Sequence, residues 1–444
     1  MTKNVLLSGI LCIISLLSRA QLTDTVRCST DPSQSYALYI PANGNKMAMP
    51  VIYCFDPHGS GILPVRKYKA LADAYGFILI GSNNSKNGND WPTTETIWQA
   101  LAADTRNRLK LDGRRIYTAG FSGGAKVASY IAIQHPGIAG VVAGGAGLPD
   151  GVSAGDFPFS FTAIAGQGDM NLTELVAISG ALDKTRTRHR LILFDGKHEW
   201  APVNTMGLAF AGLQFDAMRA GVIPKNNQAI AMYVAGSKKR YRAYQLTSQL
   251  IKAAQECDLS IALLDGLSPQ VRWFRQQADA LAKNPEYLNQ RQGQQDLLTM
   301  EQNTKAGYMQ QFQQGDDAYW TTTIHDLQTK SVGHTGIAQM YQRLLAYLSL
   351  AFYSISNQMM TGNDNVQARR FVELYKLADP TNSEAWYFSA VLDAREGKEH
   401  EAEADLLKAD NYGFRDKMRL RQQPEFQLLN PGLDMERIEK GMRP

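Results

Sequence analysis

The feature that most constrains the fold is an alternation, from about Ser35 to Gly221, of short apolar runs with stretches of helical periodicity. The runs predict strands at Tyr36–Ile40, Val51–Phe55, Phe77–Ile80, Ile116–Ala119, Val141–Ala143, Phe159–Ile164 and Leu191–Phe194. Helices are predicted between them, among others at Tyr68–Ala74, Thr96–Leu109, Lys126–Gln134 and Leu172–Leu182. This alternation predicts a mostly parallel sheet with helices on both faces, whose functional loops lie at the carboxyl ends of the strands.

The pattern changes after the segment 220–227, which contains Pro224 and two asparagines. Beyond it, strand-like runs almost vanish and apolar residues recur at helical spacing, as in Ile337, Met340, Tyr341, Leu344, Leu345 and Leu348. The 444 residues are enough for two or three domains. We therefore predict an α/β domain over 21–222, a helical region over 223–335 and a second all-α region over 336–444.

The last region resembles tetratricopeptide repeats. The signature offsets of one unit are occupied by Trp386, Ala390, Gly397, Ala402, Leu406 and Ala409. A weaker unit precedes it, with Ala368 and Pro380 one repeat length before Ala402 and Phe414. Such repeats usually present a concave face to a protein partner. A helical domain without true repeats, or a purely structural cap, remains the alternative.

The N-terminus has the features of an export signal. Lys3 precedes an apolar run that extends from Val5 to Leu17, and Ser18 and Ala20 place small residues at the −3 and −1 positions of a cleavage site. We expect residues 1–20 to be removed and the mature chain, which begins at Gln21, to be periplasmic or extracellular. A retained anchor is the alternative. No later stretch is apolar enough to predict a membrane span.

Charge and cysteine spacing favour neither nucleic acid nor metal as a ligand. The formal net charge is +4, and the strongest basic cluster, Lys238-Lys239-Arg240, is typical of a solvated helix face. No Cys/His spacing matches a zinc site, and no phosphate-binding or dinucleotide motif occurs, so no metal and no cofactor is predicted. For Cys28 and Cys54, a disulfide and buried free thiols are both open.

The most specific motif is Gly120-Phe121-Ser122-Gly123-Gly124, which fits G-x-S-x-G. A predicted strand, 115–119, enters it and a predicted helix, 125–131, leaves it, which is the context of a nucleophile elbow. Such a turn is too tight for side chains at the flanking positions, hence the glycines. It lifts the hydroxyl of Ser122 above the sheet and directs the backbone N–H of Gly123 to the place where an oxyanion would form.

A serine hydroxyl needs a base, and the base needs an orienting carboxylate. His198 follows the last predicted strand, a placement that none of the other six histidines has, and it is the predicted base. Asp169 follows the preceding strand and is the predicted acid. Asp195 is its rival, but an Asp before a Gly more often shapes a turn.

The loop after the second predicted strand reads Asp56-Pro57-His58-Gly59-Ser60-Gly61 and is similar to the His-Gly oxyanion loops of esterases. We assign the second oxyanion donor to the N–H of Ser60, with Gly61 as the alternative. Residues predicted to contact substrate are His58, Asn83, Asn84 and Trp200. For the asparagines an Asn-rich turn, and for the tryptophan ordinary packing, are the alternatives.

Three stretches make the first half of the chain similar to secreted esterases of the α/β-hydrolase superfamily, the group that includes polyhydroxybutyrate depolymerases and feruloyl esterases. They are 36–41, 112–125 and 196–202, which contain the elbow and a His-x-Trp ending. The chain departs from many members at Ser60, where those carry Cys or a further Gly, and in its helical extension. The resemblance implies an α/β-hydrolase fold and ester hydrolysis through an acyl-enzyme.

The expected substrate is therefore an ester-bearing small molecule or polymer. Two alternatives stay open from the sequence. Amide bonds are cleaved by the same machinery, so a peptidase of this fold is the first. A binding or scaffold protein, with an inactive hydrolase half and a partner on the helical repeats, is the second.

Overall fold

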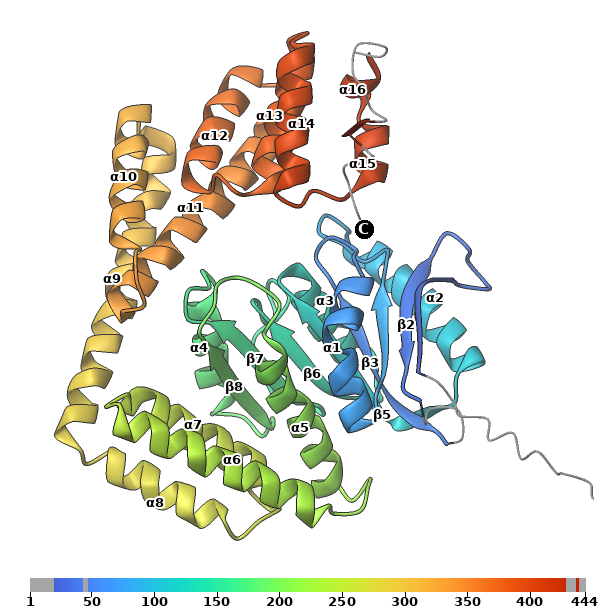
Figure 1. The fold of residues 1–444 in the computed structure, drawn as a ribbon, viewed down its shortest axis with the longest axis vertical. Coiled ribbons are helices and arrows are strands. Elements are labelled where there is room, and N and C mark those ends of the chain that lie inside the picture. Colours follow the sequence, from blue (N-terminus) through green and yellow to red (C-terminus); the bar gives the residue numbers. More distant parts are fainter. Residues whose placement is uncertain (1–19, 43–46, 429–436, 439–444) are drawn as a thin grey trace, which may run out of the picture.

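The computed structural model describes residues 20–42, 47–428 and 437–438 (Figure 1). Its first half contains an eight-stranded sheet in the order β1-β2-β4-β3-β5-β6-β7-β8. The strands are β1 (Gln21–Arg27), β2 (Ser35–Ile40), β3 (Met49–Phe55), β4 (Ile78–Ser82), β5 (Leu111–Phe121), β6 (Ile138–Gly144), β7 (Ser160–Gly166) and β8 (His189–Phe194). The pairs β1–β2 and β2–β4 are antiparallel and the other neighbours are parallel. The prediction of a mostly parallel sheet is confirmed.

Helices cover both faces of this sheet. On one face lie α1 (Ile62–Tyr75) and α5 (Val203–Arg219), and on the other lie α2 (Trp91–Arg108), α3 (Gly123–Gln134) and α4 (Leu172–Leu182). Along β3, Ile52 and Cys54 face the first core and Val51 and Tyr53 the second. Double burial explains why nearly continuous apolar runs mark the central strands. The covering of both faces by helices, together with the strand order, identifies the first half as an α/β-hydrolase fold.

The first strand has no counterpart in the sequence prediction. Residues Gln21–Arg27 of β1 pair with β2 at the edge of the sheet, and most of their side chains are exposed. An edge strand buries little, so its sequence, QLTDTVR, carries no apolar run. Strand propensity and pattern therefore give no signal for it.

The structure answers the question left open for the cysteines. Cys28, Cys54 and Cys257 are buried free thiols. Cys54 belongs to the core between the sheet and α1, whereas Cys28 belongs to the core on the opposite face. Burial raises the pKa of the Cys54 thiol to about 12, so this thiol is protonated at neutral pH.

In its described residues, the second half contains helices joined by turns and loops, and no strand. Its helices are α6 (Asn227–Leu246), α7 (Leu250–Leu264), α8 (Val271–Leu281), α9 (Pro285–Gln314), α10 (Asp317–Lys330), α11 (Gly336–Thr361), α12 (Asn365–Ala378), α13 (Ser383–Arg395), α14 (Glu399–Asn411), α15 (Lys417–Gln422) and α16 (Pro424–Leu428). Val234, Cys257 and Phe274, on α6 to α8, share one core with α1 and α5. The core is thus continuous across the boundary predicted at 222.

Two further cores hold the later helices. Met340, Leu344 and Leu348, predicted from their helical spacing, lie on α11 and are buried in one of them. The other joins α12 to α14, where the small residues Ala390 and Ala402 are fully buried between α13 and α14. These helices form a hairpin, and their assignment to the tetratricopeptide family stays a prediction.

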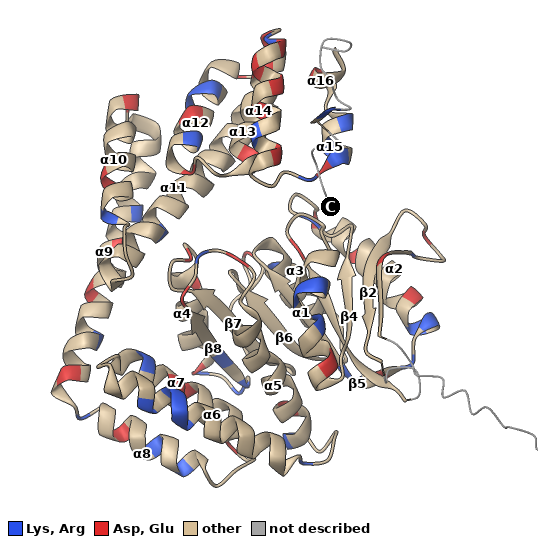
Figure 2. Ribbon diagram, viewed as in Figure 1, with Lys and Arg blue, Asp and Glu red and all other residues tan. Residues whose placement is uncertain are grey.

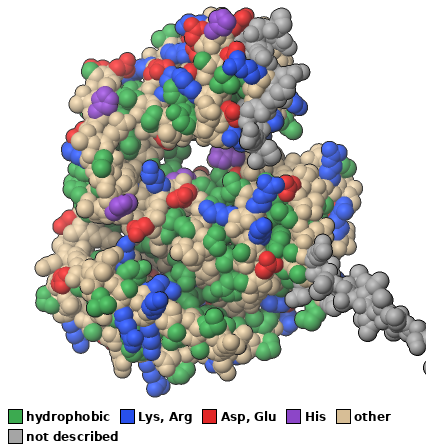
Figure 3. All heavy atoms as spheres, in the orientation of Figure 1, with side chains coloured by type: hydrophobic (Ala, Val, Ile, Leu, Met, Phe, Trp, Pro, Cys, Tyr) green, Lys and Arg blue, Asp and Glu red, His purple; other side chains and the backbone are tan. Residues whose placement is uncertain are grey.

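The C-terminal helices lie over the edge of the sheet at which the parallel strands end (Figure 1). Figure 3 shows a hollow between this helical part and the hydrolase part, with histidine side chains at its margin. On α12 to α15, residues of both charge signs are intermixed (Figure 2). Because the hollow separates the two parts, this edge of the sheet lies beneath the helical part and is still open to solvent.

The predicted export signal, 1–20, lies outside the described residues except for Ala20. Across the described ranges, no helix has both the length and the apolar character that crossing a membrane requires.

Candidate active site

Ser122 stands at the sharp turn between β5 and α3. Its backbone has φ 53° and ψ −125°, a conformation that costs a non-glycine residue about 1–3 kcal/mol. A Cβ at Gly120 would lie 2.0 Å from the carbonyl oxygen of Gly124, and one at Gly124 would lie 2.0 Å from that of Phe55. Only glycine fits at either position, because the obstructing atoms are backbone. The strain at Ser122 is thus imposed by close packing on both sides, as the motif predicts.

The structure brings Ser122, His198 and Asp169 together. The ring nitrogen Nε2 of His198 lies 2.9 Å from Ser122 Oγ, and Nδ1 lies 2.9 Å from Asp169 Oδ1. A carboxylate only accepts hydrogen bonds, so Nδ1 carries the proton and Nε2 is free to accept from the serine hydroxyl. The three residues come from the loops that follow β5, β7 and β8.

The surroundings of the three residues fix their orientation. The side chain of Asp169 is 1% exposed and that of His198 is 19% exposed, so the carboxylate is enclosed and the imidazole reaches solvent. The N–H of Asn171 donates to Asp169 Oδ1 at 2.8 Å. The ring of Phe121 packs against the imidazole at a centroid distance of 4.6 Å. Ser122 is also only partly buried, so the hydroxyl and the imidazole both remain accessible to a substrate.

Asp195, the rival for the acid, is engaged elsewhere. Its carboxylate accepts from Lys252 Nζ on α7 at 3.1 Å, and its side chain is 62% exposed. Its ion-pair partner thus lies in the helical half of the chain, and it makes no hydrogen bond to His198. The choice of Asp169 over Asp195 agrees with this geometry.

The two predicted oxyanion donors differ in their position. Gly123 is the first residue of α3, where a helical N–H has no acceptor within its own helix. The N–H of Ser60, by contrast, donates to Asp56 Oδ1 at 3.4 Å, and that of His58 donates to the same oxygen at 2.9 Å. The Ser60 amide therefore does not have the orientation of a free oxyanion donor.

Asp56 has a role in the site that the sequence motifs do not predict. Its carboxylate is 3% exposed and accepts from the Trp200 indole N–H at 2.8 Å, in addition to the two loop amides. It thereby joins the loop after β3 to the loop that carries His198. A buried Asp directly after an apolar strand was the available signal, because a buried carboxylate must find donors.

The position of Trp200 argues against its predicted role in substrate binding. Its side chain is 6% exposed, and Tyr68 and Phe121 pack against it at centroid distances of 5.9 and 5.8 Å. It supports the floor of the site. The side chain of His58, in contrast, is 73% exposed and lies at the surface of its loop.

The asparagine loop faces the site through a different residue from those predicted. Asn83 and Asn84 hold the first residue of β2. Asn83 Nδ2 donates to Ser35 Oγ at 3.3 Å, and Asn84 Oδ1 accepts from the Ser35 N–H at 2.8 Å. The exposed Asn87 instead lies against Gly123, since a Cβ built there would be 1.9 Å from Asn87 Oδ1. The backbone N–H of Asn87 donates to Pro57 O at 2.8 Å, which fixes the loop beside the elbow.

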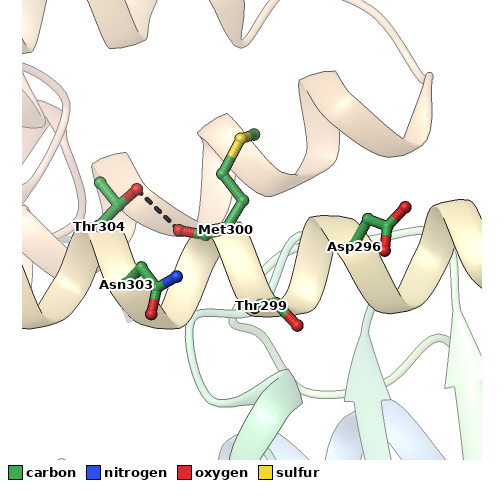
Figure 4. A pocket seen from close by; sticks show the side chains of 5 residues that line it. All are labelled: Asp296, Thr299, Met300, Asn303 and Thr304. Carbon is green, nitrogen blue, oxygen red and sulfur yellow. Dashed lines mark hydrogen bonds between the residues drawn. The ribbon is translucent and has the colours of Figure 1, made fainter.

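One surface groove lies away from these residues, on α9. It has a volume of about 570 Å³ and is lined by Asp296, Thr299, Met300, Asn303 and Thr304, all on α9 (Figure 4). A groove formed by a single helix is shallow, and no member of the triad lines it. In the described part of the chain, no three side chains of the types that ligate metals are clustered.

No protein-family profile and no curated protein matches the sequence. Solved structures that match part of the chain include an esterase from the archaeon Pyrobaculum calidifontis, with 15% identity over 46% of this chain and 85% of that chain and a TM-score of 0.36. A thermophilic carboxylesterase from a metagenomic library matches with 13% identity, 45% and 90% coverage and a TM-score of 0.38. The feruloyl esterase module of Clostridium thermocellum matches with 12% identity, 43% and 86% coverage and a TM-score of 0.36. Similarities this distant leave the function to be argued from the site.

Proposed function

We propose that the chain is an exported serine hydrolase that cleaves carboxylic esters through an acyl-enzyme. Ser122 is the nucleophile, His198 the general base and acid, and Asp169 the orienting carboxylate. The observation that carries the proposal is the pair of 2.9 Å hydrogen bonds that links the serine hydroxyl, the imidazole and a carboxylate that is 1% exposed. Such a relay has a known use in acyl transfer and costs backbone strain to build.

The first half of the reaction follows from this geometry. His198 Nε2 takes the hydroxyl proton while Ser122 Oγ attacks the ester carbonyl carbon, and the carbonyl oxygen becomes an oxyanion. The imidazolium then gives its proton to the departing alcohol oxygen, and the C–O bond breaks. Throughout, Asp169 holds the ring in one tautomer and stabilises its positive charge.

The second half repeats these steps with water. His198 takes a proton from the water molecule as it attacks the acyl carbon, and returns that proton to Ser122 Oγ as the acid product leaves. The hydroxyl and the imidazole end in their starting states.

We assign the oxyanion to the Gly123 N–H and to the side-chain amide of Asn87, in place of the Ser60 N–H. A Cβ at Gly123 would lie 1.9 Å from Asn87 Oδ1 and 3.6 Å from Asn87 Nδ2, so a half-turn of the exposed amide presents its N–H at the elbow. The Ser60 N–H, by contrast, is engaged with Asp56. Replacing Asn87 by Ala is expected to lower kcat by about 10², the smaller loss known for a single oxyanion donor, with little change in KM. Steady-state kinetics on a p-nitrophenyl ester measures this.

The matched control is Asn89→Ala, because the Asn89 amide bonds to Asn84 O at 3.0 Å instead of approaching the elbow. It should leave kcat within about twofold, as surface substitutions usually do. Equal kcat values for the wild type and the Asn87 variant would contradict the assignment of Asn87.

The proposed substrate is an ester-bearing small molecule or polymer, and the overhung but open edge of the sheet is compatible with either. The test of the reaction class is a panel of short p-nitrophenyl esters set against peptide p-nitroanilides. Turnover of the esters, with slower turnover of the anilides, supports the esterase. Faster turnover of the anilides indicates a peptidase. If neither substrate is turned over and a serine-reactive fluorophosphonate probe does not label the protein, the chain is a binding protein.

The export of the chain is tested by expressing it in full in a Gram-negative host. We expect a product that lacks residues 1–20 in the periplasm or medium. Its mass and N-terminal sequence should place Gln21 first. A full-length product confined to the cytoplasm would contradict this part of the proposal.

A further inference from the structure

A buried group of charged side chains joins α9 to α11 at the edge of the hydrolase part. Glu301 on α9 is fully buried, and Arg343 on α11 is 4% exposed. Arg343 Nε donates to Glu301 Oε2 at 2.7 Å, and Lys305 Nζ donates to Glu301 Oε1 at 2.7 Å. We call these three residues the α9–α11 clamp.

The clamp reaches out of the helical part and binds the main chain on both sides of the catalytic carboxylate. Arg343 Nη1 donates to the carbonyl oxygen of Gln167 at 2.7 Å, and Lys305 Nζ donates to that of Met170 at 3.1 Å. Asp169 lies between these two carbonyls in the sequence. Two cations, each fixed by the same glutamate, therefore hold the loop that carries the acid.

The same loop is held from the inside by the strand that leads to the base. The N–H of Gly168 donates to Gly196 O at 2.8 Å, and the N–H of Gln167 donates to Phe194 O at 2.8 Å. These bonds set the acid loop against the loop of His198, and the clamp closes its outer side. The acid loop is thus sandwiched between the hydrolase sheet and the helical part.

A contact that only held the two parts of the chain together would not need buried charged side chains. Burying a glutamate and an arginine costs desolvation, and an apolar contact of the same size would join two domains at least as well. What charged hydrogen bonds add is direction, because a guanidinium fork fixes the position of the atoms that it binds. The atoms fixed here are backbone oxygens within two residues of the triad acid.

We propose that Arg343, Lys305 and Glu301 are positioning residues, through which the helical part holds Asp169 at hydrogen-bonding distance from His198. The proposal rests on the proposed function for its kinetic consequence. Its structural part, the ordering of residues 167–171 by the helical region, stands without it. The helical half is then part of the catalytic machinery and not only a cover.

The test compares Arg343→Gln with Arg395→Gln. Arg395 makes the same kind of contact inside the helical part, with Nε on Glu425 Oε1 at 2.8 Å and Nη1 on Met360 O at 3.0 Å. Its substitution should therefore lower thermal stability in a similar way. It does not touch the acid loop, so it should leave kcat unchanged.

For Arg343→Gln we expect kcat on a p-nitrophenyl ester to fall about 10²-fold, since a displacement of about 1 Å costs that much, while KM stays within twofold. Arg343→Lys should recover part of the loss, because an ammonium reaches one acceptor where the guanidinium fork reaches two. Lys305→Met, which leaves the Arg343–Glu301 pair intact, should give a smaller loss. An unchanged kcat for Arg343→Gln, or an equal loss for Arg395→Gln, would overturn the kinetic part.

Hydrogen exchange gives a readout that does not depend on catalysis. The amides of Gly168 and Asp169, which are hydrogen-bonded in the acid loop, should exchange at least tenfold faster in Arg343→Gln than in the wild type and in Arg395→Gln. If the wild type cleaves no ester, the proposed function fails while this measurement still decides the clamp. Unchanged exchange at these amides would overturn the clamp even in an active enzyme.

Discussion

Replacing Ser122 by Ala will lower kcat for short p-nitrophenyl esters by about 10⁶, the loss seen when the nucleophile of a serine triad is removed. The alanine keeps the turn but has no oxygen to attack the carbonyl. KM should change little, because the binding surfaces remain. The measurement is steady-state kinetics on purified protein, with circular dichroism to establish that the variant folds.

A matched control is Ser248→Ala. Ser248, between α6 and α7, is one of the few non-glycine residues with positive φ among those described, at 51° against 53° for Ser122. It shares the positive φ of Ser122 but makes no hydrogen bond to a histidine. We expect full activity from this variant. An esterase activity that survives Ser122→Ala would show that the reaction occurs elsewhere.

The second large effect is expected from Asp169→Asn, which should lower kcat by about 10⁴ without unfolding the protein. The amide that replaces the carboxylate can present an N–H to His198 Nδ1. The imidazole would then carry its proton on Nε2, where it can no longer accept from the Ser122 hydroxyl. The loss thus arises from the wrong tautomer and not from lost contact, as kinetics with an unchanged melting temperature would show.

Asp195→Asn is the control for the acid, because it tests the rival carboxylate with the same change. Asp195 is exposed and paired with Lys252, and such surface pairs contribute about 0–1 kcal/mol. Its variant should keep kcat within about twofold. A large loss from Asp195→Asn, with little from Asp169→Asn, would reverse the assignment.

Much of the fold is predictable from the sequence, because central strands and amphipathic helices carry strong patterns. Val51–Phe55 is buried on both faces, and its apolar run predicts the end of β3 correctly, although the strand begins two residues earlier, at Met49. The exposed β1 carries no such run and was missed. The continuity of α6 to α8 with the hydrolase core is also invisible in a pattern, because periodicity shows that a face is buried but not against what.

The candidate site likewise has a part that the sequence predicts and a part that it does not. Ser122, Asp169 and His198 follow strands whose ends meet at one edge, so strand order alone predicts their proximity. The oxyanion loop depends on which acceptor each amide finds. Asp56 reaches the Ser60 amide and also Trp200, 144 residues away. No local motif encodes that choice, and none points to Asn87.

The α9–α11 clamp is even less predictable from the sequence than the oxyanion loop. Arg343 and Gln167 are 176 residues apart, and the contact uses a backbone carbonyl that every residue type has. Within α11, Arg343 sits among apolar residues that predict a buried helix face. An arginine on such a face signals a buried partner, but the partner's identity comes only from the packing of α9 and α11 on the acid loop.

The account depends most on an activated hydroxyl at Ser122, and an alkyl fluorophosphonate tests this directly. The measurement is the rate and site of covalent labelling, followed by peptide mass spectrometry on the wild type and on His198→Ala. We predict one adduct, on Ser122, that forms at least 10³-fold more slowly in the His198 variant. Labelling of another serine, or labelling of Ser122 that is equally fast without His198, would contradict the account.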